Sequence, residues 1–372
     1  MKRVLAIAFQ AAALILLGCG GGSAPQEVEW ARDARHESLA VTDSIGIETG
    51  DSNFVFGQIA GAAYAPDGRI AVLDMKQKAV LFYSPDGSFL MRVGRQGSGP
   101  GEFLMPSSIS FYRDGSMVVG DAMAQKLDFF DASGQYTGCL EGFFPTAPVV
   151  MQAVDSGAVV GMKPEFEQND QGMSTGFTLA RWEGAADPAV TYFSHMAPFD
   201  PTNLMAAYGE SMFAFAVSRN TGRVFRAPLT SESYTIECYE PDGTLYQTIE
   251  RSYTPVPKTQ EEMDEERSIV EQRMLESGAP AEMVNWEPKP NRDAISGLSI
   301  DSQDRLWVRR GWIDEPTFDV FDTSTGELLM VETVAYDADA ARYWQVSIDD
   351  GGILAFSANP PDYPKLYMLE QQ

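Results

Sequence analysis

Histidine is scarce in this sequence of 372 residues, which contains only His36 and His195. A zinc site built on three histidines therefore cannot form. The sequence therefore does not favour metalloenzymes that need several histidine ligands. Both histidines are interpreted as structural residues. No other combination of residues predicts a catalytic site.

Cysteine is almost as rare, with Cys19, Cys139 and Cys238. The last two lie in segments that do not occupy equivalent positions of the repeat described below. A disulfide between them is compatible with export to an oxidising compartment. We favour the alternative of two buried or semi-buried free thiols.

Positive charge is in short supply, because 27 Lys and Arg residues stand against 53 Asp and Glu residues, for a formal net charge of −26. Loss of Lys2 and Arg3 with a cleaved leader removes two positive charges and leaves −28. A protein with this large negative charge repels nucleic acid and anionic lipid headgroups. We expect a monomer that does not bind nucleic acid.

Apolar runs long enough to cross a bilayer are also missing, since a spanning helix needs roughly 20 residues. The run from Val4 to Leu17 is shorter than this and follows Lys2 and Arg3. A charged start followed by a short apolar run is typical of a cleaved secretory signal.

The apolar run ends in Leu16-Leu17-Gly18-Cys19, which resembles the lipobox of bacterial lipoproteins. The resemblance implies that the signal peptide, residues 1–18, is cut before Cys19 and that Cys19 is acylated, with palmitate as an expected chain. Gly20 to Pro25 has the composition of a flexible tether, which argues against an ordinary signal peptide that happens to contain a cysteine.

Acyl chains anchor a protein stably to a membrane. In the lipoprotein family an Asp after the cysteine is associated with retention in the inner membrane, and Gly20 stands there instead. The resemblance implies an address in the cell envelope, at the outer membrane where the host has one.

The rest of the chain contains an internal repeat. Asp67 and Asp114, Asp74 and Asp121, and Gly87 and Gly134 are each separated by 47 residues. Each unit is predicted to consist of four short strands with Asp-Gly or Gly turns, a strong hairpin signal. Weaker copies follow around Gly157, Gly222, Asp304 and Gly351.

About six such units predict an all-β fold, a six-bladed β-propeller with four-stranded antiparallel blades. The stretch from Val93 to Phe103, with Pro106, resembles the inter-blade signature of NHL repeats and of six-bladed propeller lipoproteins of bacteria. We predict an acylated cysteine and tether over residues 19–36 and the propeller over 37–372. A strand from within Val28 to Glu48 is expected to complete the last blade and close the ring.

A helical insertion interrupts the blades at about residues 251–293. Thr259 and Glu262 form a capping box, and Gly278 is a stop signal. We predict an amphipathic helix from Lys258 to Ser277 that packs on the rim of the propeller, with its acidic residues facing solvent. Its Met and Val stripe is interpreted as a face for its own domain, and a groove for a partner remains an alternative.

One set of residues occupies equivalent places at the ends of second strands and is expected to surround one mouth of the central channel. The candidate ligand-binding residues are Asp74, Asp121, Lys163, Arg226, Arg309 and Arg310, with Ser357 at the sixth equivalent place and Trp312 nearby. The alternative is structural: Asp side chains often cap loops by accepting hydrogen bonds from backbone N–H groups, and in this interpretation the basic residues pair with these aspartates across blades.

The leading functional hypothesis is a membrane-anchored module that binds a protein, peptide, glycan or small anionic ligand at this channel mouth. Gluconolactonases and strictosidine synthase-like proteins are also six-bladed propellers with Ca²⁺ or a catalytic carboxylate near the channel. This resemblance leaves a Ca²⁺-dependent lactonase or hydrolase as the alternative; otherwise no cofactor is expected. A third possibility is a protein partner docked on the inserted helix.

Overall fold

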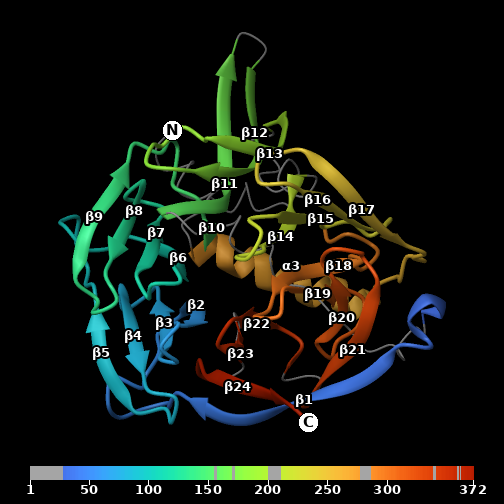
Figure 1. Ribbon diagram of the computed structural model, residues 1–372, viewed down its shortest axis with the longest axis horizontal. Helices are drawn as coiled ribbons and strands as arrows, with labels where there is room; N and C mark the ends of the chain where they lie inside the picture. The colour runs from blue at the N-terminus through green and yellow to red at the C-terminus, as the bar shows by residue number, and fades with distance from the viewer. Residues whose placement is uncertain are drawn as a thin grey trace.

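The computed structural model describes residues 28–154, 157–169, 172–199, 211–276, 286–337, 341–357, 360 and 362–372. The expected signal peptide, Cys19 and the Gly/Ser tether lie outside these residues. In the described part of the chain, four-stranded units are arranged around a common centre (Figure 1).

The described strands form six antiparallel blades, with the first strand of each blade nearest the centre (Figure 1). Blades 1 and 2 consist of β2 (Ile59–Tyr64), β3 (Ile70–Asp74), β4 (Ala79–Tyr83), β5 (Phe89–Val93), β6 (Pro106–Phe111), β7 (Met117–Asp121), β8 (Lys126–Phe130) and β9 (Tyr136–Glu141). Blades 3 and 4 consist of β10 (Val150–Val154), β11 (Ala158–Asn169), β12 (Gly172–Trp182), β13 (Val190–Pro198), β14 (Phe213–Val217), β15 (Val224–Pro228), β16 (Tyr234–Tyr239) and β17 (Leu245–Arg251). Blades 5 and 6 consist of β18 (Ile295–Ile300), β19 (Arg305–Arg310), β20 (Thr317–Asp322), β21 (Leu328–Ala335), β22 (Trp344–Asp349), β23 (Gly352–Ser357), β24 (Leu366–Gln371) and β1 (Arg35–Ile45).

The repeat seen in the sequence is confirmed in the first two blades. β3 and β7 are both five-residue strands with every residue buried, and they lie 47 residues apart. Gly68 and Gly115 follow the Asp of each first turn and adopt φ of 86° and 84°, in the left-handed region that favours glycine. The Asp-Gly pairs thus turn the chain tightly between neighbouring strands.

The loop between blades 1 and 2 is a tight crossing, as its glycines predict. A side chain at Gly94 would place a Cβ atom 2.2 Å from the ring of the buried Phe103. Glu102 accepts a hydrogen bond from Gly99 N at 2.9 Å and forms an ion pair with Arg95 at 2.8 Å. These contacts fix the path of the chain into β6.

The ring is closed by the N-terminal strand, as the sequence predicts. β1 pairs antiparallel with β24 and so completes blade 6, and on its other edge it pairs parallel with β21 of blade 5. Blades 5 and 6 therefore share one eight-stranded sheet. The first half of β1, Arg35 to Ala40, pairs with β21, and the second half, from Leu39 to Ile45, pairs with β24, so β1 bridges the two blades and completes the ring.

The folded body begins before the predicted boundary at residue 37. A short 3₁₀ helix, η1 (Glu29–Ala31), precedes β1 at the edge of the ring (Figure 1). Trp30 donates a hydrogen bond to Ser252 O at 2.9 Å, and its ring lies 5.3 Å from that of Tyr234. Trp30 is thus held against blade 4, and Arg35 and His36 already pair with β21 of blade 5, so these residues of the predicted tether pack on the propeller.

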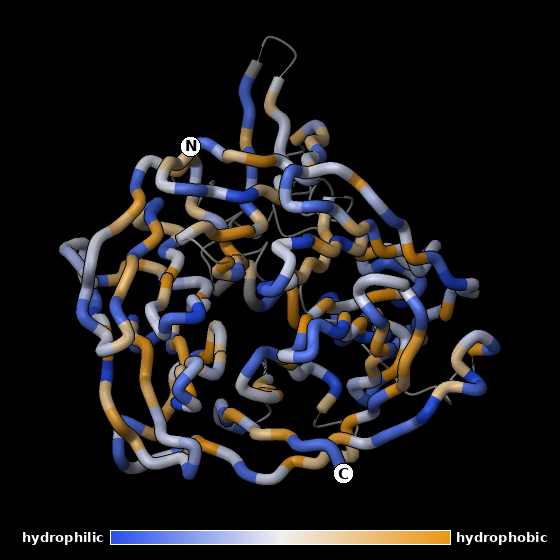
Figure 2. The backbone as a smooth tube through the Cα atoms, in the orientation of Figure 1, coloured by the Kyte–Doolittle hydropathy of each residue, from blue (hydrophilic) through white to orange (hydrophobic). Residues whose placement is uncertain are grey.

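The apolar core lies between neighbouring blades. Phe82 of β4 and Phe111 of β6 pack with ring centroids 6.2 Å apart, and similar apolar clusters occupy the other joints. Hydrophobic and hydrophilic stretches alternate around the whole ring (Figure 2). Burial between blades is what forces the strands to assemble in a closed circle.

The inserted helix exists, as α3 (Gln260–Glu276), and its capping box is formed. Thr259 N donates to Glu262 and Glu262 N donates to Thr259 Oγ1. Its predicted place on the rim is wrong, because α3 lies across the middle of the ring in Figure 1. The reason is that its carboxylates pair with Arg292 and Arg342, which precede the central strands β18 and β22.

The acidic side of α3 is also less solvated than expected. Glu262 is buried and pairs with the buried Arg292, while Glu265 pairs with Arg342 at 3.0 Å and Glu266 pairs with Lys258. Charge pairs with the loops therefore hold the acidic side of the helix, while Val270 and Met274 of the predicted apolar stripe are buried.

Candidate functional site

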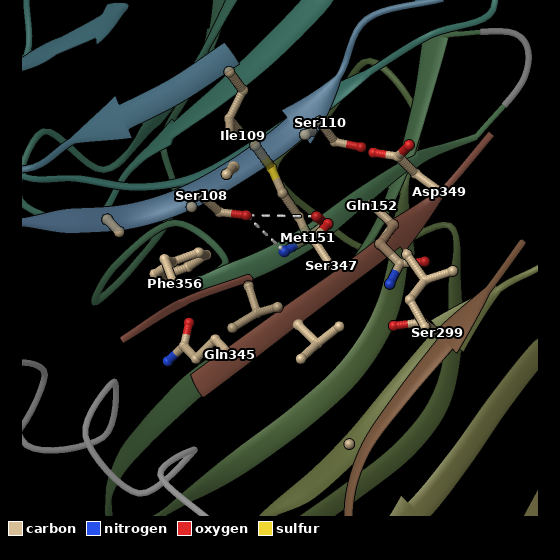
Figure 3. Close-up of a pocket in the computed structure, with 18 of the residues that line it drawn as sticks. Ser108, Ile109, Ser110, Met151, Gln152, Ser299, Gln345, Ser347, Asp349 and Phe356 are labelled. Carbon is tan, nitrogen blue, oxygen red and sulfur yellow. Dashed lines mark hydrogen bonds between the residues drawn. The ribbon is translucent and has the colours of Figure 1, made fainter. Parts of the chain in front are cut away.

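A cavity of about 830 Å³ lies along the centre of the ring. Its wall includes residues from the first strand of every blade: β2, β6, β10, β14, β18 and β22. Figure 3 shows labelled side chains of β6, β10, β18 and β22 around this space. The repeated unit thus supplies one strip of wall per blade.

The middle of the wall is polar but uncharged. Hydroxyl and amide groups alternate there with apolar side chains. The polar members are Ser107, Ser108, Ser110, Gln152, Ser296, Ser299, Gln345 and Ser347, and the apolar ones include Ile109, Met151, Phe215, Val346 and Ile348. Such a mixture suits a ligand that offers both hydrogen-bonding groups and apolar surface.

Part of this polar set ties the blades together. Ser108 Oγ accepts a hydrogen bond from Met151 N at 3.1 Å, and Ser110 Oγ accepts one from Ala153 N at 2.9 Å. Gln152 in turn accepts from Val217 N at 2.9 Å. A side chain of one central strand therefore satisfies a backbone N–H of the next, which stabilises the blade joint.

Another part of the set is unused. Ser299, Gln345 and Ser347 line the cavity (Figure 3) and make no hydrogen bond with the described residues. Their donors and acceptors are available to a molecule inside the cavity.

One end of the cavity is acidic. Asp349 accepts hydrogen bonds from Tyr64 N and Gly351 N, both at 2.9 Å, and burial raises the pKa of Asp349 to about 6. Asp350, beside it, forms an ion pair with Arg219 at 3.2 Å. Asp349 ends β22 and Asp350 follows it, and neither was among the residues that the sequence nominated for the site.

The nominated aspartates are placed as loop caps. The buried Asp74 accepts hydrogen bonds from four backbone N–H groups, those of Gly57, Gln58, Lys76 and Gln77. Asp121, its equivalent in blade 2, accepts from Leu104, Met105 and Ala124. Neither carboxylate lines the central cavity.

Three nominated basic residues pair within their own blades. Lys163 pairs with Glu165 at 2.6 Å, Arg226 with Glu237, and Arg310 with Asp319 at 2.6 Å. The predicted pairing with Asp74 and Asp121 across blades is wrong, because a carboxylate on the same or the adjacent strand is nearer.

Arg309 is the one nominated ligand-binding residue that lines the cavity, and Ser357 at the sixth equivalent place lines it too. The Arg309 guanidinium donates hydrogen bonds to Trp344 O and, at 3.3 Å, to Arg342 O. Burial lowers the pKa of Arg309 to about 10. Trp312 is buried and uses its carbonyl to accept a hydrogen bond from Arg292 at 2.9 Å.

The other sequence candidates are dispersed. His36 lies on β1 and His195 on β13, and the described residues contain no group of three or more His, Cys, Asp or Glu arranged to hold a metal ion. Cys139 and Cys238 are free thiols, but only Cys238 is buried and Cys139 is exposed.

In the part of the chain that the structure describes, no helix has the length and apolar character needed to traverse a lipid bilayer.

These sheets and their central cavity define the chain as a six-bladed β-propeller. Residues 30–157 match a family model described as a 6-bladed beta-propeller, and no curated protein matches the sequence.

Three solved structures to which this chain is similar have low sequence identity to it. A Bacteroides fragilis protein described as exported is 12% identical, with a TM-score of 0.48, covering 91% of this chain and 99% of that one. The WD40 beta propeller domain of Doa1 is also 12% identical, with a TM-score of 0.45 over 90% and 97% of the two chains. A gluconolactonase from Xanthomonas campestris is 13% identical, with a TM-score of 0.46 over 91% and 99%.

Proposed function

We propose that this protein is a lipid-anchored envelope protein whose propeller binds a small polar ligand in the central cavity. The observation that carries the proposal is the cavity of about 830 Å³ with unused hydrogen-bonding groups on its wall. Cavities of roughly 300 to 1,000 Å³ with a few convergent polar groups are typical ligand sites.

The wall chemistry supports an uncharged, hydroxyl-rich body for most of the ligand. Ser299 and Ser347 offer hydroxyl groups that both donate and accept, and Gln345 offers an amide. The apolar side chains of Met151 and Ile348 lie between such groups along the wall. A saccharide presents the same alternation of hydroxyl and C–H surface, and we take it as the favoured ligand class.

The anchor rests on the N-terminal pattern that precedes the described residues. Eight residues lie between Cys19 and Val28, and an extended chain covers at most about 30 Å over the nine steps from one to the other. Since Val28 lies next to η1 at the edge of the ring, an acylated Cys19 keeps the propeller close to the membrane surface.

A cavity-filling variant tests the binding function. Ser347→Trp places a large side chain inside the cavity, while Thr137→Trp adds the same side chain at an exposed position of β9. We expect neutral mono- and disaccharides to show saturation-transfer NMR signals with the wild type and with Thr137→Trp, and no signal with Ser347→Trp. A panel without a binder, or binding that survives Ser347→Trp, contradicts the proposal.

A further inference from the structure

The guanidinium of Arg309 differs from those of Arg310 and Arg219 because it has no carboxylate partner among the described residues. Arg310, the next residue, pairs with Asp319 at 2.6 Å, and Arg219 at the acidic end of the cavity pairs with Asp350 at 3.2 Å. Arg309 donates only to two carbonyls, Trp344 O and Arg342 O, and forms no ion pair with a described carboxylate. Its positive charge is therefore not neutralised by the described part of the protein.

An unmatched charge next to a cavity favours binding of an anion. A guanidinium carries five N–H donors in a rigid fork, of which two hydrogen bonds to carbonyls are formed here. Burial lowers the pKa of Arg309 to about 10, so the group is still charged at neutral pH. Arg309 is partly buried, and a partly desolvated charge without a counter-ion costs free energy, which a carboxylate that reaches the free donors lowers.

The two ends of the cavity differ in charge, because Arg309 lies at one end and the aspartates lie at the other. Arg309 bonds to Trp344 at the start of β22, whereas Asp349 and Asp350 lie at and just beyond the end of the same strand. Asp349 lies five residue steps along the strand from Trp344, a distance of about 16 Å. An anionic group is thus attracted at one end and repelled at the other, while the uncharged wall lies between.

We propose that Arg309 forms an anion subsite, and that the cavity binds a hydroxyl-rich ligand with a carboxylate, such as an acidic sugar, with the carboxylate against Arg309. The inference rests on the proposed binding function and names the ligand class of the same cavity. Sugar hydroxyls then meet the Ser299, Gln345 and Ser347 groups, and the carboxylate accepts the free guanidinium donors.

A matched pair of sugars tests the subsite. D-glucuronate and D-glucose share a pyranose ring and differ in the carboxylate at one end, so their affinities isolate its contribution. We expect the wild-type protein to bind D-glucuronate about tenfold more tightly than D-glucose, the size of effect typical of a charge-assisted hydrogen bond. The preference is expected to fall at high NaCl, because salt screens an ion pair that solvent reaches.

Variants at Arg309 separate the charge from its structural bonds. Arg309→Met is expected to bring the two affinities within about twofold of each other, while Arg309→Lys keeps a positive charge and part of the preference. Arg92→Met is the control, because it removes one positive charge at an exposed residue of β5 outside the cavity. Melting curves show whether each variant is folded, and the wild-type salt dependence needs no variant at all.

The outcomes distinguish the two proposals. Equal affinities of the wild type for both sugars, a preference that does not respond to salt, or a preference retained by Arg309→Met overturns the anion subsite. If Ser347→Trp still abolishes D-glucose binding in that case, the binding cavity stands. If neither sugar binds the wild-type protein, the binding cavity and the anion subsite are both overturned.

Discussion

Glu37 of β1 lies directly opposite Glu332 of β21 in the parallel ladder that joins the N-terminal strand to blade 5. Glu332 is fully buried, and one of its carboxylate oxygens accepts a hydrogen bond from Gln371 of β24 at 2.6 Å. Burial raises the pKa of Glu332 to about 7; Gln371 opposes this rise and the facing Glu37 adds to it. The closing seam, meaning the junction of β1 with β21 and β24, therefore contains a carboxyl group, that of Glu332, which titrates near neutral pH.

The closing seam makes stability depend on pH. Glu332 titrates near 4.3 in an unfolded chain and at about 7 in the folded one. Between these values the folded protein binds the extra proton, so its stability falls as the pH rises. We expect ionisation of Glu332 to lower the free energy of unfolding of the wild type by about 2 to 3 kcal/mol between pH 4.5 and 7.5. Glu332→Gln has no such group and is expected to lack this part of the decrease.

Urea unfolding of the two proteins at both pH values measures the difference. Burial also raises the pKa values of Asp128 and Asp349, each to about 6, and both remain in the variant. Their contribution cancels when the two pH dependences are compared. Parallel pH profiles for the wild type and Glu332→Gln would show that the seam does not titrate as described.

The Asp74 cap is expected to be among the most sensitive polar positions. Asp74→Ala leaves four backbone N–H groups without their acceptor, and we expect a loss of about 2 to 4 kcal/mol in the free energy of unfolding. Asp67→Ala, in an exposed hairpin turn of the same blade, is expected to cost less than about 1 kcal/mol. Equal losses in urea titrations would refute the capping role.

Closure of the ring depends on the apolar face of β1. Leu39 is fully buried, between blades 5 and 6, so Leu39→Ala is expected to cost about 2 to 5 kcal/mol. Leu329 lies on the neighbouring strand β21 but is 41% exposed, so Leu329→Ala is the matched control with an expected loss below about 1 kcal/mol. A Leu39→Ala variant as stable as the control would mean that β1 contributes little to closure.

Acylation of Cys19 is tested in a bacterial host. We expect the wild type to incorporate labelled palmitate and to sediment with membranes, because acyl chains supply the anchoring energy. Cys19→Ser is expected to lose both properties, and Cys139→Ser, at an exposed thiol, to keep them. Label retained by Cys19→Ser would rule out the lipobox interpretation.

The architecture was predictable from turns and spacing because these are local properties. The 47-residue register of Asp74 and Asp121 correctly placed both at the ends of equivalent buried strands. The closing strand was also predictable, since an N-terminal apolar pattern near Leu39 has an evident partner in a ring with one incomplete blade. The parallel pairing of β1 with β21 was not, because it depends on how two blades meet in space.

The cavity wall was harder to predict. Arg309 and Arg310 are adjacent in sequence and equal in chemistry, yet successive side chains of a strand point to opposite faces. Arg309 therefore reaches the cavity and blade 6, whereas Arg310 bonds to Asp319. Ser299 and Ser347 have no distinctive local signal, and only the meeting of six central strands gives them a shared role.

Because β1 is hydrogen-bonded along both edges, to β24 and to β21, it determines how the molecule resists tension at its N-terminal end. A pull on the residues before Val28 acts first on the Trp30 contacts and then on the parallel ladder with β21, which holds Arg35 to Ala40. The antiparallel ladder with β24 begins only at Leu39, so the load passes along β1 from blade 5 to blade 6, with Leu39 and Ala40 as the residues that pair with both.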